Sequence, residues 1–187
     1  MTPRADATEN RDRILRAARD IVTSADDVAE VRLNEIAKAA GVGQGTLYRH
    51  FPTRNDLLLE VYRLDLDEMC DAAAVLVREL PAGEALERWL ERVEEYAWVK
   101  RGVFAAVEAA MRADVTSHSR DQIAAAVEML LSAGREAGTV RDDVDARDVV
   151  LLIGYLSLLT PAERSVRAPR LRSVVLAGLS PAGRPGP

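Results

Sequence analysis

The 187-residue sequence predicts an all-helical protein of about nine helices. Ala, Leu, Glu and Arg, which favour helices, are abundant, whereas aromatic residues make up only 4% of the chain. Apolar residues recur at helical spacing along most of the sequence, and short stretches with Gly or Pro separate these segments. A hydrophobic content of 48% and a charged content of 29% are typical of an ordinary globular protein.

The first predicted helix extends from about residue 8 to about residue 23, and Thr8 or Asn10 can provide its N-cap. Arg11 and Arg13 lie on its exposed side, where they either contact a phosphate or are simply solvated. Its inward face is formed by Ile14, Leu15, Ala18, Ile21 and Val22.

Residues 33 to 51 predict two short helices joined by a tight turn. The first helix has one apolar face, formed at helical spacing by Leu33, Ile36, Ala37 and Ala40. Gly41 is free to adopt a positive φ in the turn. The second helix runs from Gln44 to His50, and it is too short to be stable without support from neighbouring helices.

Polar side chains on such a supported helix are what a helix-turn-helix needs to read a DNA groove. Gln44 can pair with an adenine edge and Arg49 with a guanine edge. The hydroxyls of Thr46 and Tyr48 suit phosphate oxygens. Gly45 allows the start of the helix to approach the DNA backbone closely. Two amphipathic helices with a glycine turn also occur in many helical proteins, so this pattern by itself leaves DNA binding open.

The chain resembles the tetracycline-repressor (TetR) family of bacterial transcriptional regulators in the string AAGVGQGTLYRHFPTRNDLL. The resemblance covers Arg11 to about Tyr62. It includes an Ala-Gly-Val turn, a helix of the T-L-Y-x-H-F type and a Leu-rich helix after a short basic link. It implies a DNA-binding set in which Arg54 touches a phosphate. This set comprises Asn34, Gln44, Gly45, Thr46, Tyr48, Arg49, His50 and Arg54.

The motif departs from the family pattern at its helix starts. Arg32 stands where a Thr or Ser usually precedes the first helix, so the customary side-chain cap is missing. Gly43 opens the second helix without a hydroxyl group. Asn34 occupies a position where the family often has Arg, and we therefore expect it to contact DNA more weakly.

A long helix is predicted from about residue 55 to Leu80, with Thr53 as its cap. Its start touches the DNA-reading motif and its end lies in the remainder of the protein. The sequence thus predicts a helix-turn-helix DNA-binding domain of three helices over residues 1–54. A helical effector-binding and dimerisation domain is predicted over residues 55–180, followed by a disordered tail at residues 181–187.

Three further helices are predicted between Pro81 and Glu136, with a bend at Gly102 and a cap at Thr116 or Ser117. Their large side chains suit a small apolar or amphipathic effector. The candidate ligand-binding residues are Trp89, Val93, Tyr96, Phe104, Met111 and Val127. The family resemblance implies a pocket among them, although each of these residues can equally fill an ordinary core.

The last two predicted helices span Asp148 to Leu159 and Arg167 to Leu179. The preceding link, with Gly138 to end one helix and Asp145 to cap the next, also resembles the TetR family. The first of the two is apolar nearly all round and must be covered on two sides. A four-helix interface between two subunits would cover it; the alternative is that both helices are simply core. The predicted interface residues are Val149, Leu152, Ile153, Leu156, Leu171 and Val175.

The charge distribution places limits on DNA binding. The net charge is −5, but residues 1–55 contain nine Arg and Lys against eight Asp and Glu. DNA affinity must therefore come from the placement of individual cations and not from bulk charge.

Catalytic chemistry is not expected, because the sequence contains no metal-ligand spacing, phosphate-binding loop or nucleophile motif. We expect no cofactor and no metal. The single Cys70 excludes an intrachain disulfide, and it is either a small buried group or a redox sensor. No signal peptide or membrane span is predicted, so we expect a cytoplasmic protein without a membrane partner.

Taken with the resemblance, these features predict a homodimeric repressor that binds a palindromic double-stranded DNA operator and is released by a small-molecule effector. Two alternatives stay open. One is an activator or a ligand-independent DNA-binding protein whose C-terminal domain only dimerises. The other is a helical protein-interaction module that no longer binds DNA.

Overall fold

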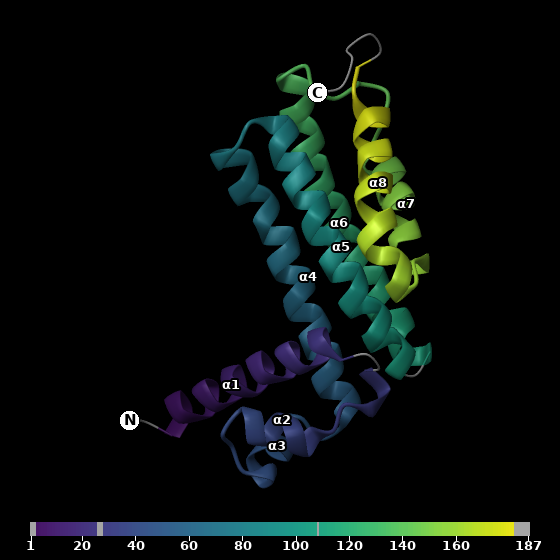
Figure 1. Cartoon of the computed structure of the whole chain (residues 1–187). Helices are drawn as coiled ribbons and strands as arrows, with labels where there is room; N and C mark the ends of the chain where they lie inside the picture. Colours follow the sequence, from purple (N-terminus) through teal and green to yellow (C-terminus); the bar gives the residue numbers. More distant parts are fainter. Residues whose placement is uncertain (1–2, 26–27, 108, 182–187) are drawn as a thin grey trace. The chain divides into compact units, whose positions relative to one another are not determined.

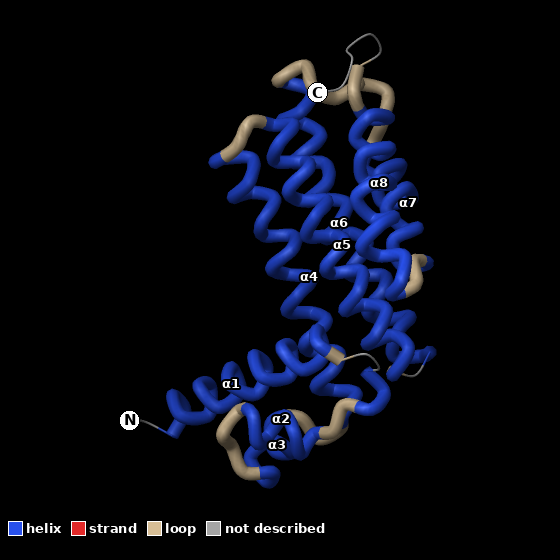
Figure 2. The backbone as a smooth tube through the Cα atoms, viewed as in Figure 1, coloured by secondary structure: helices blue, strands red, loops and turns tan. Residues whose placement is uncertain are grey.

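The computed structural model describes residues 3–25, 28–107 and 109–181, and it describes no side chains at residues 3–5, 105, 109–118, 155, 157 and 161. Every regular element in the described residues is a helix, which confirms the all-helical class (Figures 1 and 2). Within the same residues, no helix has the length and apolar character that a membrane crossing requires. The sequence-predicted tail falls outside the described residues from position 182 onward.

The described chain forms eight α-helices and two 3₁₀ helices. Their bounds are α1 (Pro3–Ser24), η1 (Val28–Glu30), α2 (Leu33–Ala39), α3 (Gln44–His50), α4 (Arg54–Glu79), α5 (Ala82–Ala106), α6 (Ala109–Glu136), α7 (Ala146–Ile153), η2 (Gly154–Leu158) and α8 (Pro161–Leu179). The short helices of the predicted motif are confirmed, whereas several boundaries elsewhere differ from the prediction.

The predicted bend at Gly102 is wrong. Helix α5 continues through Gly102 to Ala106, and α6 then begins at Ala109, well before the predicted cap. Two helices therefore replace three. Gly102 allows α5 to pack closely against Val28, because a Cβ atom at this position would collide with Cγ2 of Val28.

The helix starts at both ends of the chain also differ from the prediction. Helix α1 begins at Pro3, several residues before the predicted caps. Helix α8 begins at Pro161 and not at Arg167, because the side chains of Thr160 and Glu163 form a capping box at its start. Proline is favoured at the first helical position, since it has no N–H group to leave unpaired.

The cap at Asp145 is confirmed, but the helix after it is shorter than predicted. The Asp148 amide donates to Asp145 Oδ1 at 2.9 Å, and the Asp145 amide donates to Asp148 Oδ2 at 3.1 Å. Helix α7 ends at Ile153, and the chain tightens into η2 from Gly154 to Leu158. The tighter winding rotates the side chains after Ile153 away from the positions that one continuous α-helix would give them.

The described residues divide into two compact units. Unit 1 contains residues up to 65 together with 99–112, and unit 2 contains residues 66–98 and those from 113 onward. The units divide inside α4, α5 and α6, so each of these helices contributes residues to both. The functional boundary predicted after residue 54 stays a prediction.

Unit 1 is built around the inward face of α1. Helix α1 packs against α2 and α3 (Figure 1). Its predicted inward residues Ile14, Leu15, Ala18 and Val22 are buried, and Ile21 is half-buried. Arg19 Nε lies 2.6 Å from Oδ1 of the buried Asp65, which ties α1 to α4 within this unit.

Unit 2 has a core of large apolar side chains from α4, α5 and α6. Trp89 is fully buried, and its Nε1 donates to the Met69 carbonyl oxygen at 3.0 Å, so the indole N–H keeps a partner inside the core. Helix α8 joins this core through Arg172, which contacts Glu94 at 3.1 Å and Glu91 at 3.4 Å. Burial is the largest influence on the pKa of Glu94 and raises it, against the opposing charge of Arg172.

The turn between α2 and α3 is closed by Gly41 and Arg13. Gly41 has a φ of 64°, the left-handed conformation predicted for it. Arg13 Nη2 donates to the carbonyl oxygens of Ala40 at 2.6 Å and Gly41 at 3.0 Å. A cation at the C-terminus of a helix satisfies its free carbonyls and its partial negative charge. Arg13 therefore stabilises the end of α2.

We expect Gly41→Ala to destabilise the chain by about 1–2 kcal/mol, which is the cost of the left-handed conformation for a residue with a Cβ atom. The added Cβ would also lie 2.6 Å from Arg13 Nη2 and displace it. Thermal unfolding followed by circular dichroism should show a melting temperature roughly 3–6 °C lower. Gly83→Ala is the matched control, because Gly83 lies in α5, has no positive φ and has nothing within 4 Å of an added Cβ. Equal melting temperatures for the two variants would contradict this account of the turn.

Candidate nucleic-acid interface

Helix α3 is a short helix held in place from one side. Its buried residue Leu47 is completely enclosed, and Phe51, which ends the helix, is also buried. Both α1 and α2 pack against it. Because seven residues cannot form a stable helix in isolation, these contacts determine which side chains of α3 face outward.

The outward side chains include most of the predicted DNA-binding set. Asn34, Gln44, Gly45, Tyr48 and Arg49 are exposed, whereas Thr46, His50 and Arg54 are half-buried. All eight lie in α2, α3 or the first residue of α4, and all belong to unit 1. The structure therefore brings the predicted set together in one compact unit, while its contact with DNA stays a prediction.

Arg54 has a structural role that the sequence did not indicate. Its Nε donates to the Val31 carbonyl oxygen at 3.0 Å, and its Nη2 donates to the Val28 carbonyl oxygen. These bonds attach the link before α2 to the start of α4. A phosphate contact by Arg54 stays a prediction. It would have to use the guanidinium N–H groups that do not already donate to these two carbonyl oxygens.

Arg11 and Arg13 are engaged inside unit 1, an outcome that neither sequence-based alternative described. Arg11 pairs with Glu60, and its guanidinium lies 5.5 Å from the centroid of the Phe51 ring. Arg13 holds the end of α2. Both cations therefore support the motif from within.

The side chains of three exposed cations of unit 1 have neither a hydrogen bond nor an ion pair with any described residue: Arg32, Lys38 and Arg49. All three belong to α2, α3 or the residue just before α2. Arg32 and Lys38 were not in the predicted set. A basic residue at each end of α2 is the sequence signal that marks both positions. Cations without internal acceptors can pair with phosphates and release the counterions of DNA.

A polar hollow of about 1190 Å³ lies beside α2. Its lining includes Arg32, Asn34 and Tyr48 together with the carboxylates of Glu30 and Glu35. The two carboxylates oppose any anion in this hollow, a DNA phosphate included, so the hollow itself is a poor anion site. The geometry thus provides outward donors, unpaired cations and a supported helix on one unit.

The N-terminal residues 14–61 match the family model described as bacterial regulatory proteins, tetR family. Residues 81–181 match the model of the C-terminal domain of SbtR-like transcriptional regulators. The chain belongs to the TetR family. It is thus a transcriptional regulator with a helix-turn-helix DNA-binding domain, which confirms the resemblance seen in the sequence.

Solved structures of TetR regulators are similar over nearly the whole chain. A TetR transcriptional regulator from Streptomyces coelicolor is 36% identical, with a TM-score of 0.80 over 92% of this chain and 99% of that chain. A TetR transcription regulatory protein from Mycobacterium vanbaalenii is 30% identical, with a TM-score of 0.75 over 96% of this chain and 100% of that chain.

An HTH-type transcriptional regulator from Staphylococcus aureus is 45% identical over 64 residues, which is 34% of this chain and 34% of that protein. The match therefore spans about a third of that relative's length.

TetR-family proteins are regulators and not enzymes. Among the described residues, no three His, Cys, Asp or Glu side chains are placed to hold a metal ion.

The structure separates the predicted ligand-binding residues of this TetR-family chain. Trp89, Val93, Tyr96 and Val127 are buried in unit 2. Phe104 belongs to unit 1, where its ring centroid lies 5.1 Å from that of Tyr62. The side chain of Met111 lies outside the described residues. The placement of Phe104 could not be read from the sequence, because its helical spacing fits either unit.

The predicted dimer-interface residues are mostly turned into their own chain. Val149, Ile153, Leu156 and Val175 are buried, Leu171 is half-buried and Leu152 is 49% exposed. The more exposed apolar residues of this region were not predicted. They are Leu151 at 62%, Leu158 at 80%, Val166 at 53% and Val174 at 67% exposure. The sequence could not separate these exposed residues from the buried ones, because the consecutive apolar residues 149–153 fall on more than one face of α7.

Cys70 is half-buried in α4 of this TetR-family chain, and its pKa is raised from 9.0 to about 11. Burial is the largest cause, and the carboxylates of Asp67 and Asp71 add to it, because both disfavour the thiolate. This environment is the opposite of the electropositive one that activates redox-sensing cysteines. The thiol stays protonated until the pH approaches its raised pKa.

We therefore expect native Cys70 to react with iodoacetamide at pH 8 roughly 100-fold more slowly than free cysteine, since its thiolate fraction is lower by about that factor. Mass spectrometry of timed aliquots measures the rate. The same chain in denaturant is the control and should react like free cysteine. A native rate equal to that of free cysteine would show that the thiol is activated.

Proposed function

We propose that the chain is a homodimeric repressor that binds a palindromic operator through α3 and leaves it when a small effector binds. The observation that carries this proposal is the outward polar face of α3 together with the three cations of unit 1 that have no acceptor among the described residues. Exposed cations without internal acceptors are available to pair with phosphates.

Two kinds of DNA contact follow from this geometry. Gln44 and Arg49 are exposed on α3 and are of the types that pair with adenine and guanine edges in the major groove. Arg32 lies just before α2 and Lys38 lies in α2, where both side chains suit contacts with phosphates. Phosphate contacts position the protein, and base contacts supply the sequence preference.

A second copy of the chain would supply the second recognition helix. Two such helices reach successive major grooves when they are about 34–36 Å apart, which matches a palindromic site. The exposed apolar residues Leu151, Leu158, Val166 and Val174 support this step, because large exposed apolar side chains gathered in α7, η2 and α8 are typical of a surface that a partner covers.

Release by an effector would act through the helices that both units share. Helix α4 begins beside the motif at Arg54 and ends in unit 2 at Glu79. An effector that prefers one arrangement of unit 2 would shift α4 and change the spacing of the recognition helices. A difference of about 1–3 kcal/mol in DNA affinity between the two states is a common size for such coupling.

One observation favours a ligand-independent DNA-binding protein as the second candidate. Trp89, Val93, Tyr96 and Val127 fill the core where an effector pocket was predicted. Thermal-shift measurements against a panel of amphipathic compounds separate the two candidates. Any compound that raises the melting temperature and also releases DNA supports the repressor, whereas release by none supports the second candidate.

Arg49→Ala is expected to weaken binding to the operator by tenfold or more, because each good base contact contributes about 1–3 kcal/mol and the dimer has two copies. The operator is first obtained by selection from genomic DNA, where we expect an inverted repeat. Fluorescence anisotropy then measures the affinity. Arg16→Ala is the matched control, since Arg16 is an exposed arginine of unit 1 that bonds the Asp12 carbonyl oxygen. Unchanged operator affinity in the Arg49 variant would refute the role of α3, and selection of no repeat would favour a protein-interaction module.

Val174→Asp combined with Leu158→Asp is expected to yield monomers, because two charges would enter an apolar interface without partners. Light scattering after size exclusion should give the monomer mass of 20.4 kDa for this variant and twice that for the natural chain. Val75→Asp is the control, since Val75 is also an exposed apolar residue but lies on α4. A natural chain that is monomeric at micromolar concentration would overturn the homodimer.

A further inference from the structure

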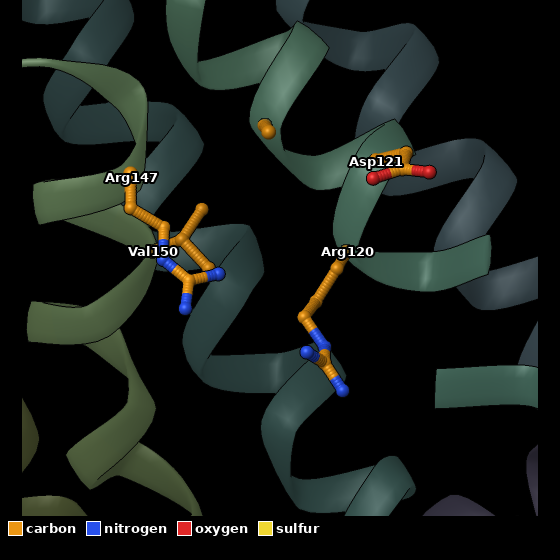
Figure 3. Close-up of a pocket in the computed structure, with 5 residues that line it drawn as sticks. Arg120, Asp121, Arg147 and Val150 are labelled. Atoms are coloured by element: carbon orange, nitrogen blue, oxygen red, sulfur yellow. The ribbon is translucent and has the colours of Figure 1, made fainter. Parts of the chain in front are cut away.

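A hollow of about 350 Å³ lies between α6 and α7 in unit 2 (Figure 3). Helix α6 contributes Arg120, Asp121 and Ala124, and α7 contributes Arg147 and Val150. Its volume falls in the range of small-molecule sites. None of these residues belongs to the ligand-binding set predicted from the sequence.

The two arginines of this hollow are unpaired. Neither the Arg120 nor the Arg147 side chain has a hydrogen bond or an ion pair with any described residue. Most other described arginines of unit 2 do have carboxylate partners: Arg78, Arg88, Arg135, Arg141, Arg167 and Arg172. Two like charges around one hollow repel each other, so an anion between them would be stabilised by both.

The side chains around the hollow are arranged by polarity. Arg120 and Arg147 extend in the same direction from α6 and α7, whereas Asp121 lies on the side of α6 that is turned away from Arg147 (Figure 3). Ala124 follows Arg120 by four residues and Val150 follows Arg147 by three, so each apolar residue shares a helix face with its arginine. Both apolar residues are half-buried. The hollow thus combines two guanidinium groups with an apolar wall.

We propose that this hollow binds a small amphipathic oxyanion. Arg120 and Arg147 would hold a carboxylate or phosphate head group, since guanidinium groups donate paired hydrogen bonds that match both. Ala124 and Val150 would contact the apolar body. This inference rests on the proposed function in one respect, because it gives the effector of the repressor a chemical class and a place.

The location of the hollow connects such a ligand with the surface proposed to pair two chains. Leu151 follows Val150 directly in α7 and is 62% exposed. A ligand that bridges α6 and α7 would therefore act on the helix that presents this apolar residue. It would also act on α6, which contributes its first residues to unit 1.

The test measures binding to the full chain without DNA, by isothermal titration calorimetry. The probes are octanoate, octyl phosphate, the uncharged octanamide and inorganic phosphate. We expect octanoate or octyl phosphate to bind at least tenfold more tightly than octanamide and inorganic phosphate. The tighter of the two amphiphiles identifies the head group. Equal affinity for octanamide would overturn the role of the arginines, equal affinity for inorganic phosphate would overturn that of the apolar wall, and no binding of either amphiphile would overturn the site.

A matched set of variants locates the binding. The double variant Arg120→Gln with Arg147→Gln should bind the amphiphile about 100-fold more weakly. Each tenfold step in affinity corresponds to about 1.4 kcal/mol. Arg92→Gln is the control, because Arg92 is an exposed arginine of unit 2 without a described partner and lies outside the hollow. Circular dichroism verifies that each variant is folded. An unchanged affinity in the double variant would refute the site, whereas binding at the hollow without release of operator DNA would refute only the repressor mechanism.

Discussion

The burial of Leu47 is the contact on which the DNA-reading surface depends. Helix α3 has seven residues and only this one enclosed apolar side chain, with Phe51 at its end. A helix of this length gains too little from its own hydrogen bonds to persist alone. Its rotation about its own axis is therefore set by where Leu47 packs, and that rotation decides that Gln44, Tyr48 and Arg49 face outward.

Seven basic residues of unit 1 divide into two groups with different tasks. Arg11, Arg13, Arg19 and Arg54 are bound by carboxylates or backbone carbonyls of the same unit. They hold the elements of unit 1 together, whereas the side chains of Arg32, Lys38 and Arg49 have no acceptor among the described residues. A nearly neutral segment can therefore keep outward cations that are free to pair with phosphates, because its other arginines are held within the unit by carboxylates or backbone carbonyls.

Unit 2 shows the same division for apolar side chains. Val149 and Ile153 of α7 are buried in their own chain, whereas Leu151 points to solvent at 62% exposure. Apolar content alone cannot separate core from interface in residues 149–153, which are all apolar and fall on several faces of α7. The hollow between α6 and α7 adds unpaired charge to this region, so unit 2 offers both an apolar surface and a cationic site close to α7.

The sequence by itself determined the helical class, the TetR resemblance, the α2–α3 turn with Gly41 at positive φ, and the cap at Asp145. Each of these depends on local chemistry: spacing, a residue without a Cβ atom, or a side chain bonded to a neighbouring amide. Only the tertiary structure decided that α5 passes straight through Gly102 and that Phe104 packs on Tyr62 in unit 1. It also decided that Arg13 and Arg54 bind backbone carbonyls distant in sequence. Such contacts join residues tens of positions apart, and no short-range pattern records which of several compatible partners a side chain meets.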